Sequence, residues 1–131
     1  MRNVSLRFVA VPVLLFLNGA LWGAENRAPL TRVQDVIALT KAQAAEPRQV
    51  ALEGTVTFVR PDDSSLFIQQ DGLGIFVQFG SDLGLVPGDR VVVSGETVSS
   101  FRTDIRATDV RFLAHGKLPV PRSAQIEDLI Q

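Results

Sequence analysis

The chain has 131 residues, which is enough for one domain but not for two. Hydrophobic residues make up 46% and charged residues 21%, as in a globular protein with a core. The net charge of -1 excludes a global basic field that would hold nucleic acid, and the absence of cysteine excludes disulfides, thiolate metal sites and a cysteine nucleophile.

Residues 1–24 have the layout of a secretory signal peptide. Two arginines flank a short basic start, Phe8–Leu17 is apolar, and small residues follow up to Ala24. The charge-free stretch Phe8–Ala24 has 17 residues, the short limit for crossing a bilayer, so a retained membrane anchor is the alternative. Removal of this leader leaves 11 of the 13 basic residues against 14 acidic ones, a net charge of -3. We expect an exported, periplasmic protein that meets the membrane only if the leader is retained.

Residues 25–48 are expected to form a tether and a short helix. Thr31 can cap a helix whose pattern breaks near Thr40 and ends at Pro47. Its apolar residues share one face, and they are Val33, Val36, Ile37 and Ala44. Such a weak helix is best suited to cover one open end of the β domain that follows.

Residues 49–115 contain five strand-like runs. These are Val50–Val59, Leu66–Asp71, Gly74–Phe79, Arg90–Val98 and Asp104–Leu113. Gly54 and Gly95 interrupt the first and fourth runs, and each allows the sharp coil or bulge that a small barrel requires. A hairpin turn is expected around Asp71-Gly72-Leu73-Gly74. The order and spacing predict a mostly β, five-stranded, closed OB-like barrel.

Alternation with a period of two assigns the faces of these strands. In the first strand, one face is expected to hold Val50, Leu52, Gly54, Val56 and Phe58. In the hairpin, the positions expected to face inward are Leu66, Ile68, Ile75, Val77 and Phe79, and the apolar residues of the fifth strand are Ile105, Ala107, Val110 and Phe112. The positions of the hairpin expected to face outward are Phe67, Gln69, Phe76 and Gln78. A slip of phase near Thr108 predicts a bulge in the last strand. Residues 116–131 then form an extended tail and a terminal helix that Ser123 caps.

Several segments together carry a resemblance to a known family. They are Leu30–Val33, Val50–Thr57, Leu66–Gln69, Gly74–Val77, Pro87–Val91, Val93–Gly95, Leu118–Pro119 and Pro121–Arg122. With them, the stretch from Leu30 to Ile130 resembles a periplasmic OB-like module, the N-terminal extracytoplasmic domain of bacterial membrane sensors such as histidine kinases and diguanylate cyclases. The resemblance implies a sensing role and no catalytic residue. A stand-alone relative and the front end of a longer sensor both stay open.

Two aromatic residues are the best candidates for a contact surface. Phe67 and Phe76 should be cross-strand neighbours on the outer face, where OB barrels stack planar ligands or bases. Gln69, Gln78 and Thr57 are expected nearby. The alternative is that both rings pack under the helix or the tail, or only support the sheet.

Two arginines are the second candidate. Arg60 ends the first strand and Arg102 lies in the loop between the fourth and fifth, and these loops flank the binding face of an OB barrel. The two guanidinium groups can therefore bind an anionic group. Surface ion pairs with Asp62, Asp63 and Asp104 are the alternative.

The sequence gives little support for metal binding, catalysis or nucleic-acid binding. Asp62 and Asp63 lack the spacing of a calcium loop, and His115 is the only histidine, so we expect no metal, no cofactor and no enzyme. Nucleic-acid binding is disfavoured because the only lysines are Lys41 and Lys117. The sequence predicts a non-catalytic, exported OB-fold binding module in sensing or signalling, with a small molecule or an envelope protein as partner. A structural or stress-protection protein of the cell envelope is the alternative.

Overall fold

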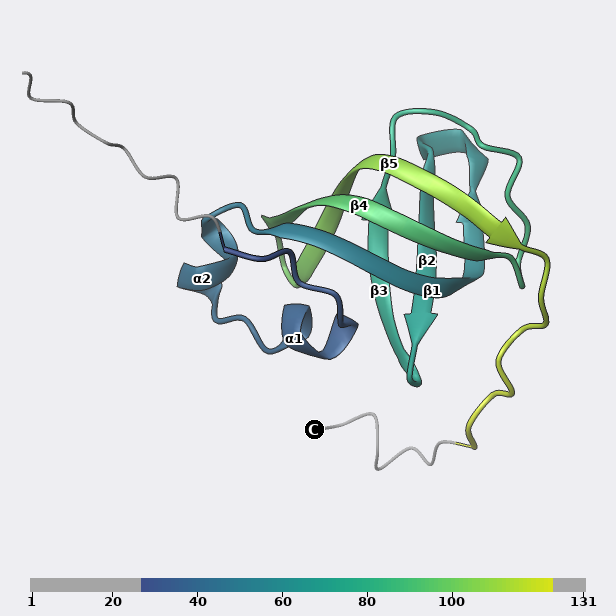
Figure 1. The fold of residues 1–131 in the computed structure, drawn as a ribbon, viewed down its shortest axis with the longest axis horizontal. Coiled ribbons are helices and arrows are strands. Elements are labelled where there is room, and N and C mark those ends of the chain that lie inside the picture. The colour runs from purple at the N-terminus through teal and green to yellow at the C-terminus, as the bar shows by residue number, and fades with distance from the viewer. Residues whose placement is uncertain (1–26, 124–131) are drawn as a thin grey trace, which may run out of the picture.

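The computed structural model describes residues 27–123, in which five strands close into a barrel after two short helices (Figure 1). The strands are β1 (Gln49–Arg60), β2 (Ser65–Gln70), β3 (Leu73–Gln78), β4 (Arg90–Ser99) and β5 (Thr103–Ala114). Their order around the barrel is β1-β2-β3-β5-β4, and β4 pairs with β1 to close it. Neighbours are antiparallel except β3 and β5, which are parallel. The predicted OB-like barrel is confirmed.

The interior of the barrel is filled by aliphatic residues, many of which come from the alternating positions that the sequence pattern marks. Residues in this core are at most 5% exposed, and they are Val33, Val36, Val50, Leu52, Val56, Leu66, Ile68, Ile75, Val77, Val91, Val93 and Ile105. Complete burial of one such side chain contributes about 1.5–3 kcal/mol to stability. The barrel is therefore held together mainly by side chains at every second position of its strands.

One extra residue in β1 reverses the direction of Phe58. Val56 pairs with Ile68, but Phe58 pairs with Phe67, so Thr57 is bulged out of the ladder between β1 and β2. Phe58 is 52% exposed, so the prediction that it shares one face with the buried residues Leu52 and Val56 is wrong. The alternation assumed an unbroken period of two, whereas a bulge moves every later residue to the other face.

The expected bulge in β5 is confirmed. Ser94 pairs with Asp109 and Gly95 pairs with Ala107, so Thr108 is the extra residue. Phe112, the last of the four apolar residues noted in this strand, is 45% exposed. It lies next to a second register shift, near the end of β5, where the barrel no longer encloses it.

Two glycines lie where strands approach closely. A methyl group on Gly95 would lie 2.2 Å from the carbonyl oxygen of Arg106 and 2.7 Å from Cα of Ala107. On Gly54 it would lie 3.0 Å from the carbonyl oxygen of Gln69. These backbone contacts permit the strong coil of a small barrel, which was the expected role of both residues.

The helical segment consists of α1 (Val33–Ile37) and α2 (Lys41–Ala45), separated near Thr40 as predicted. Thr40 caps α2, because its Oγ1 accepts the N–H of Gln43 at 3.2 Å and the Gln43 side chain accepts the N–H of Thr40 at 2.9 Å. The predicted cap at Thr31 is wrong, since Arg32 occupies the N-cap of α1 without a side-chain bond. Ile37 is 49% exposed instead of buried.

Gln70 fastens this segment to the barrel. Its Oε1 accepts the N–H of Val33 at 2.8 Å, and its Nε2 donates to the carbonyl oxygens of Thr31 at 3.2 Å and Glu53 at 2.9 Å. Val33 and Val36 are fully buried in the core. The segment thus covers one end of the barrel, as predicted.

The tail leaves β5 at the end of the barrel opposite the helices (Figure 1). Residues 115–123 have no regular secondary structure. The predicted signal peptide and the predicted terminal helix after Ser123 lie outside the described residues. Within residues 27–123, no helix has the length and apolar character to cross a membrane.

Candidate binding groove

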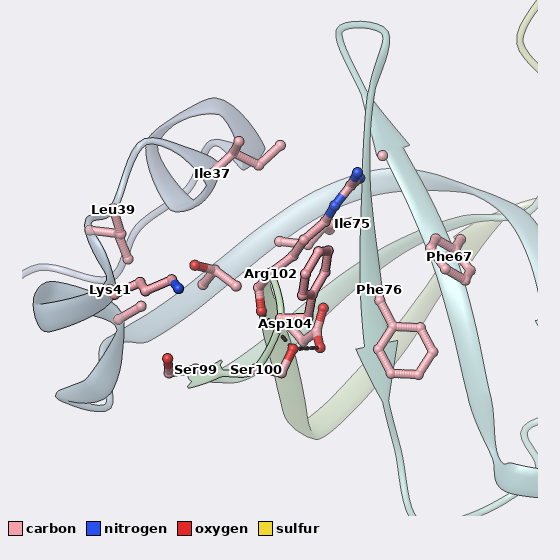
Figure 2. Close-up of a pocket in the computed structure, with 14 residues that line it drawn as sticks. Ile37, Leu39, Lys41, Phe67, Ile75, Phe76, Ser99, Ser100, Arg102 and Asp104 are labelled. Atoms are coloured by element: carbon pink, nitrogen blue, oxygen red, sulfur yellow. Dashed lines mark hydrogen bonds between the residues drawn. The ribbon is translucent and has the colours of Figure 1, made fainter. Parts of the chain in front are cut away.

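A groove of about 650 Å³ lies between the α1–α2 segment, the β2–β3 hairpin and the β4–β5 loop (Figure 2). Its volume falls within the range of sites that bind small molecules. Its lining residues are Ile37, Leu39, Lys41, Ala44, Phe67, Gly74, Ile75, Phe76, Ser99, Ser100, Phe101, Arg102, Thr103 and Asp104. The groove is therefore assembled from three segments that are distant in the sequence.

Aromatic rings form a row on the outer face beside this groove. Phe67 and Phe76 pair directly across β2 and β3, as predicted, with ring centroids 5.2 Å apart in an edge-to-face arrangement. Phe58 extends the row onto β1, with its ring centroid 6.5 Å from that of Phe67. Such pairs support the sheet and also offer ring surface to a planar ligand. The sequence pattern missed Phe58 because of the bulge at Thr57.

Phe101 lies at the tip of the β4–β5 loop and is 95% exposed. The loop is held by Ser100, whose Oγ lies 2.6 Å from the carbonyl oxygen of Arg102 and 2.5 Å from Oδ2 of Asp104. These bonds fix the backbone that presents Phe101 and Arg102 to the groove. Sequence reasoning missed Phe101, although a large apolar residue within a polar loop was a visible signal.

Two cationic side chains line the groove from different walls. Lys41 comes from α2 and Arg102 from the β4–β5 loop, and Figure 2 shows the Lys41 nitrogen directed toward the loop side. Neither side chain forms an ion pair with any residue between 27 and 123. Asp104 supplies the carboxylate of the lining. Arg102 was a predicted site residue, whereas Lys41 was not.

Arg60 does not belong to this groove. Its Nη1 lies 3.2 Å from Oδ2 of Asp63, which is one of the surface ion pairs considered as the alternative. Arg60 ends β1, whereas Arg102 follows Ser99, which ends β4; since β1 and β4 are antiparallel, the two arginines lie at opposite ends of the barrel. Of the two predicted arginines, a small ligand in the groove would therefore contact only Arg102.

The remaining predicted site residues surround the aromatic pair without lining the groove. Thr57 donates its hydroxyl to the carbonyl oxygen of Phe67 at 3.3 Å. Gln69 pairs with Gly74, and Gln78 pairs with Ser65. The structure thus brings Phe67, Phe76 and Arg102 together and leaves the polar residues at the margin.

A polar pair that sequence reasoning missed lies away from the groove. Asp89 is 2% exposed; its Oδ2 accepts the N–H of Val86 at 3.0 Å, and its Oδ1 lies 2.7 Å from Nδ1 of His115. The bond from Val86 lowers the pKa of Asp89; burial opposes this shift, and His115 adds to it. The His115 side chain is 80% exposed. The pair ties the start of the tail to the turn before β4.

Groups that would support metal chemistry are not assembled in this part of the chain. Among residues 27–123, no three His, Cys, Asp or Glu side chains are grouped to hold a metal ion. The groove contains hydroxyl groups from Ser99, Ser100 and Thr103, but His115, the only histidine, is not among its lining residues. Its lining suits contact with a ligand through rings, hydroxyl groups and two cations.

Comparison with known proteins supports the fold. No protein-family model matches the chain, and no curated protein is significantly similar to it. Among solved structures, the chain is similar to one described as the hypothetical protein ygiW from E. coli, with a TM-score of 0.50 and 20% sequence identity. The match covers 64% of this chain and 89% of that chain. At this identity the likeness shows a shared closed, OB-like β-barrel and nothing about activity.

Proposed function

We propose that the protein is an exported, non-catalytic OB-fold module that binds a small molecule in the groove. The observation that carries this proposal is the arrangement of Phe67, Phe76 and the exposed Phe101 around a hollow of about 650 Å³. Exposed aromatic surface next to a concave site is characteristic of binding surfaces. Stacking on one such ring contributes about 1–3 kcal/mol in OB barrels.

The groove also suits a role in sensing. One wall is the α1–α2 segment and another is the barrel, so a ligand contacts both. Such a ligand stabilises one arrangement of helices and barrel only to the extent that it binds that arrangement more tightly. The predicted leader and the resemblance to sensor modules support an extracytoplasmic position for this event.

Two other functions compete with this proposal. A structural or stress-protection protein of the envelope needs a folded barrel but no ligand. A nucleic-acid-binding barrel needs a basic track, since phosphate contacts dominate its affinity. The groove carries two cations and one carboxylate, which favours a small ligand over a polyanion.

The proposal is tested by a thermal-shift screen of planar metabolites. A ligand of the groove should raise the melting temperature of the wild type and have little effect on the Phe67→Ala/Phe76→Ala double variant. Phe101→Ser provides a second variant that leaves the core intact, because this ring is 95% exposed. Val120→Ser is the matched control, since Val120 is 89% exposed and does not line the groove.

The possible results separate the functions. Shifts that weaken in Phe101→Ser and persist in Val120→Ser support binding in the groove. Equal shifts in all variants contradict it, and no shift with any compound favours a structural role.

Export is tested separately by the intact mass of the protein from a periplasmic extract. Cleavage after Ala24 is expected, and an uncleaved cytoplasmic chain contradicts export.

A further inference from the structure

We propose that the groove selects organic anions, with a flat apolar body over Phe67 and Phe76 and a carboxylate or phosphate group held by Arg102 and Lys41. This inference rests on the proposed function and names the class of ligand. Its basis is the placement of two cations on different walls of one aromatic groove.

Arg102 is the stronger anchor. Its guanidinium presents planar donors that match a carboxylate or a phosphate in a two-bond arrangement. The backbone at this position is fixed, because the carbonyl oxygen of Arg102 accepts the Ser100 N–H at 3.1 Å and lies 2.6 Å from the Ser100 Oγ. Figure 2 shows the side chain extending along the groove between Ile37 and the strands of the hairpin. The backbone of Arg102 is therefore held in place by Ser100, while its guanidinium group extends into the groove.

Arg102 has no ion pair within residues 27–123, whereas four other arginines of the domain have one. Arg32, Arg60, Arg90 and Arg106 each form an ion pair with a nearby carboxylate. Asp104, two residues after Arg102, is the closest candidate in sequence, but its Oδ2 is bonded to Ser100 instead. A cation that pairs with no carboxylate of residues 27–123 and lies beside apolar rings is available for an anion from outside.

Lys41 completes the charge of the site. It is the first residue of α2, whose start is fixed by the capping box of Thr40 and Gln43. Its flexible stem allows the ammonium group to follow anions of different size. The lining side chains then carry two positive charges and one negative charge, in a chain with a net charge of -1. The groove is thus locally positive on a protein that is negative as a whole.

The test compares probes that differ in their head group. Binding of 1-naphthoate, 1-naphthyl phosphate and the neutral 1-naphthalenemethanol to the exported protein is measured by titration calorimetry, and the site is located from amide shifts in NMR spectra. We expect at least one anion to bind about tenfold more tightly than the alcohol, the ratio that one charge-assisted hydrogen bond supplies. The two anions distinguish a carboxylate ligand from a phosphate ligand.

Paired variants identify the cause of any preference. Lys41→Gln/Arg102→Gln should remove the preference for the anion and leave binding of the alcohol unchanged. Lys117→Gln/Arg111→Gln makes the same change in charge at two exposed residues outside the groove and should retain the preference. Loss of preference in both double variants contradicts the inference, because it would then reflect net charge alone.

The inference and the proposed function fail in different ways. If the alcohol binds in the groove as tightly as both anions, and the groove variant changes nothing, selection of anions is overturned and binding in the groove stands. If no probe shifts the amides of Gly74, Phe101 or Thr103, both the inference and the proposed function are contradicted for planar ligands.

Discussion

Replacement of Gly95 by alanine should be the most disruptive single-methyl change in the barrel. The added methyl group would lie 2.2 Å from the carbonyl oxygen of Arg106 and 2.7 Å from Cα of Ala107. Both are backbone atoms of the paired strand β5, so neither can rotate away as a side chain would. Apolar contacts are optimal at about 3.5–4.0 Å, so β4 and β5 would have to separate by about 1 Å.

The cost of this separation follows from the interactions that it disturbs. Overpacking a well-packed region costs about 1–3 kcal/mol, and each ladder hydrogen bond that is weakened costs up to about 1 kcal/mol more. We therefore expect Gly95→Ala to lower the free energy of unfolding by about 3 kcal/mol. For a domain of this size, that corresponds to a fall in melting temperature of roughly 12–24 °C.

Two other glycines provide a graded control. On Gly54 the methyl group would lie 3.0 Å from a backbone oxygen, so Gly54→Ala should cost about 1 kcal/mol. Around Gly80 there is nothing within 4 Å, so Gly80→Ala should change stability by less than about 0.5 kcal/mol. Thermal and urea unfolding followed by far-ultraviolet circular dichroism would rank the three. A melting temperature of Gly95→Ala within a few degrees of that of Gly80→Ala would refute the close approach of β4 and β5.

Three further predictions concern the helical segment, the turn before β4 and the bulge in β1. Gln70→Leu removes three hydrogen bonds and leaves the N–H of Val33 without its partner, so urea unfolding should show that the free energy of unfolding falls by about 2–3 kcal/mol. An equal fall for Gln69→Leu would contradict the role of Gln70. The pKa of Asp89 is lowered from its usual value of 3.8, chiefly by the bond from Val86. Its carboxylate therefore stabilises the fold above about pH 4, and this stabilisation is lost as the pH falls through the folded-state pKa. The difference in unfolding free energy between the wild type and Asp89→Asn should shrink as the pH falls below about 4, and a difference at pH 3 equal to that at pH 5 would contradict this. Phe58→Ala should cost about 1 kcal/mol because the ring is 52% exposed, whereas Leu52→Ala should cost about 2–5 kcal/mol, and equal losses in urea unfolding would place Phe58 in the core.

The barrel could be predicted because its determinants are local. Alternation of Val50, Leu52, Val56 and their counterparts marks one face of each strand, and the turn at Asp71 and Gly72 joins two of them. The exposure of Phe58 could not be predicted in this way, because the bulge at Thr57 moves Phe58 to the other face of β1 without changing the composition of the strand. The pairing that reveals the bulge is a contact between β1 and β2, and no pattern within β1 alone contains it.

The candidate site could be predicted only in part. Phe67 and Phe76 face each other because the hairpin register follows from its two-residue turn. Arg102 was placed from the expected position of the β4–β5 loop. Lys41 was missed because the wall that carries it reaches the groove through tertiary contacts, such as those of Gln70, that have no signal in the local sequence.

The central claim is that this groove binds a small planar ligand. A crystal structure of the protein with 1-naphthoate would test it most directly. We expect the naphthalene ring to contact Phe76 and the carboxylate to bond to the guanidinium of Arg102. A probe bound elsewhere on the barrel, with the groove empty at saturating concentration, would contradict the claim.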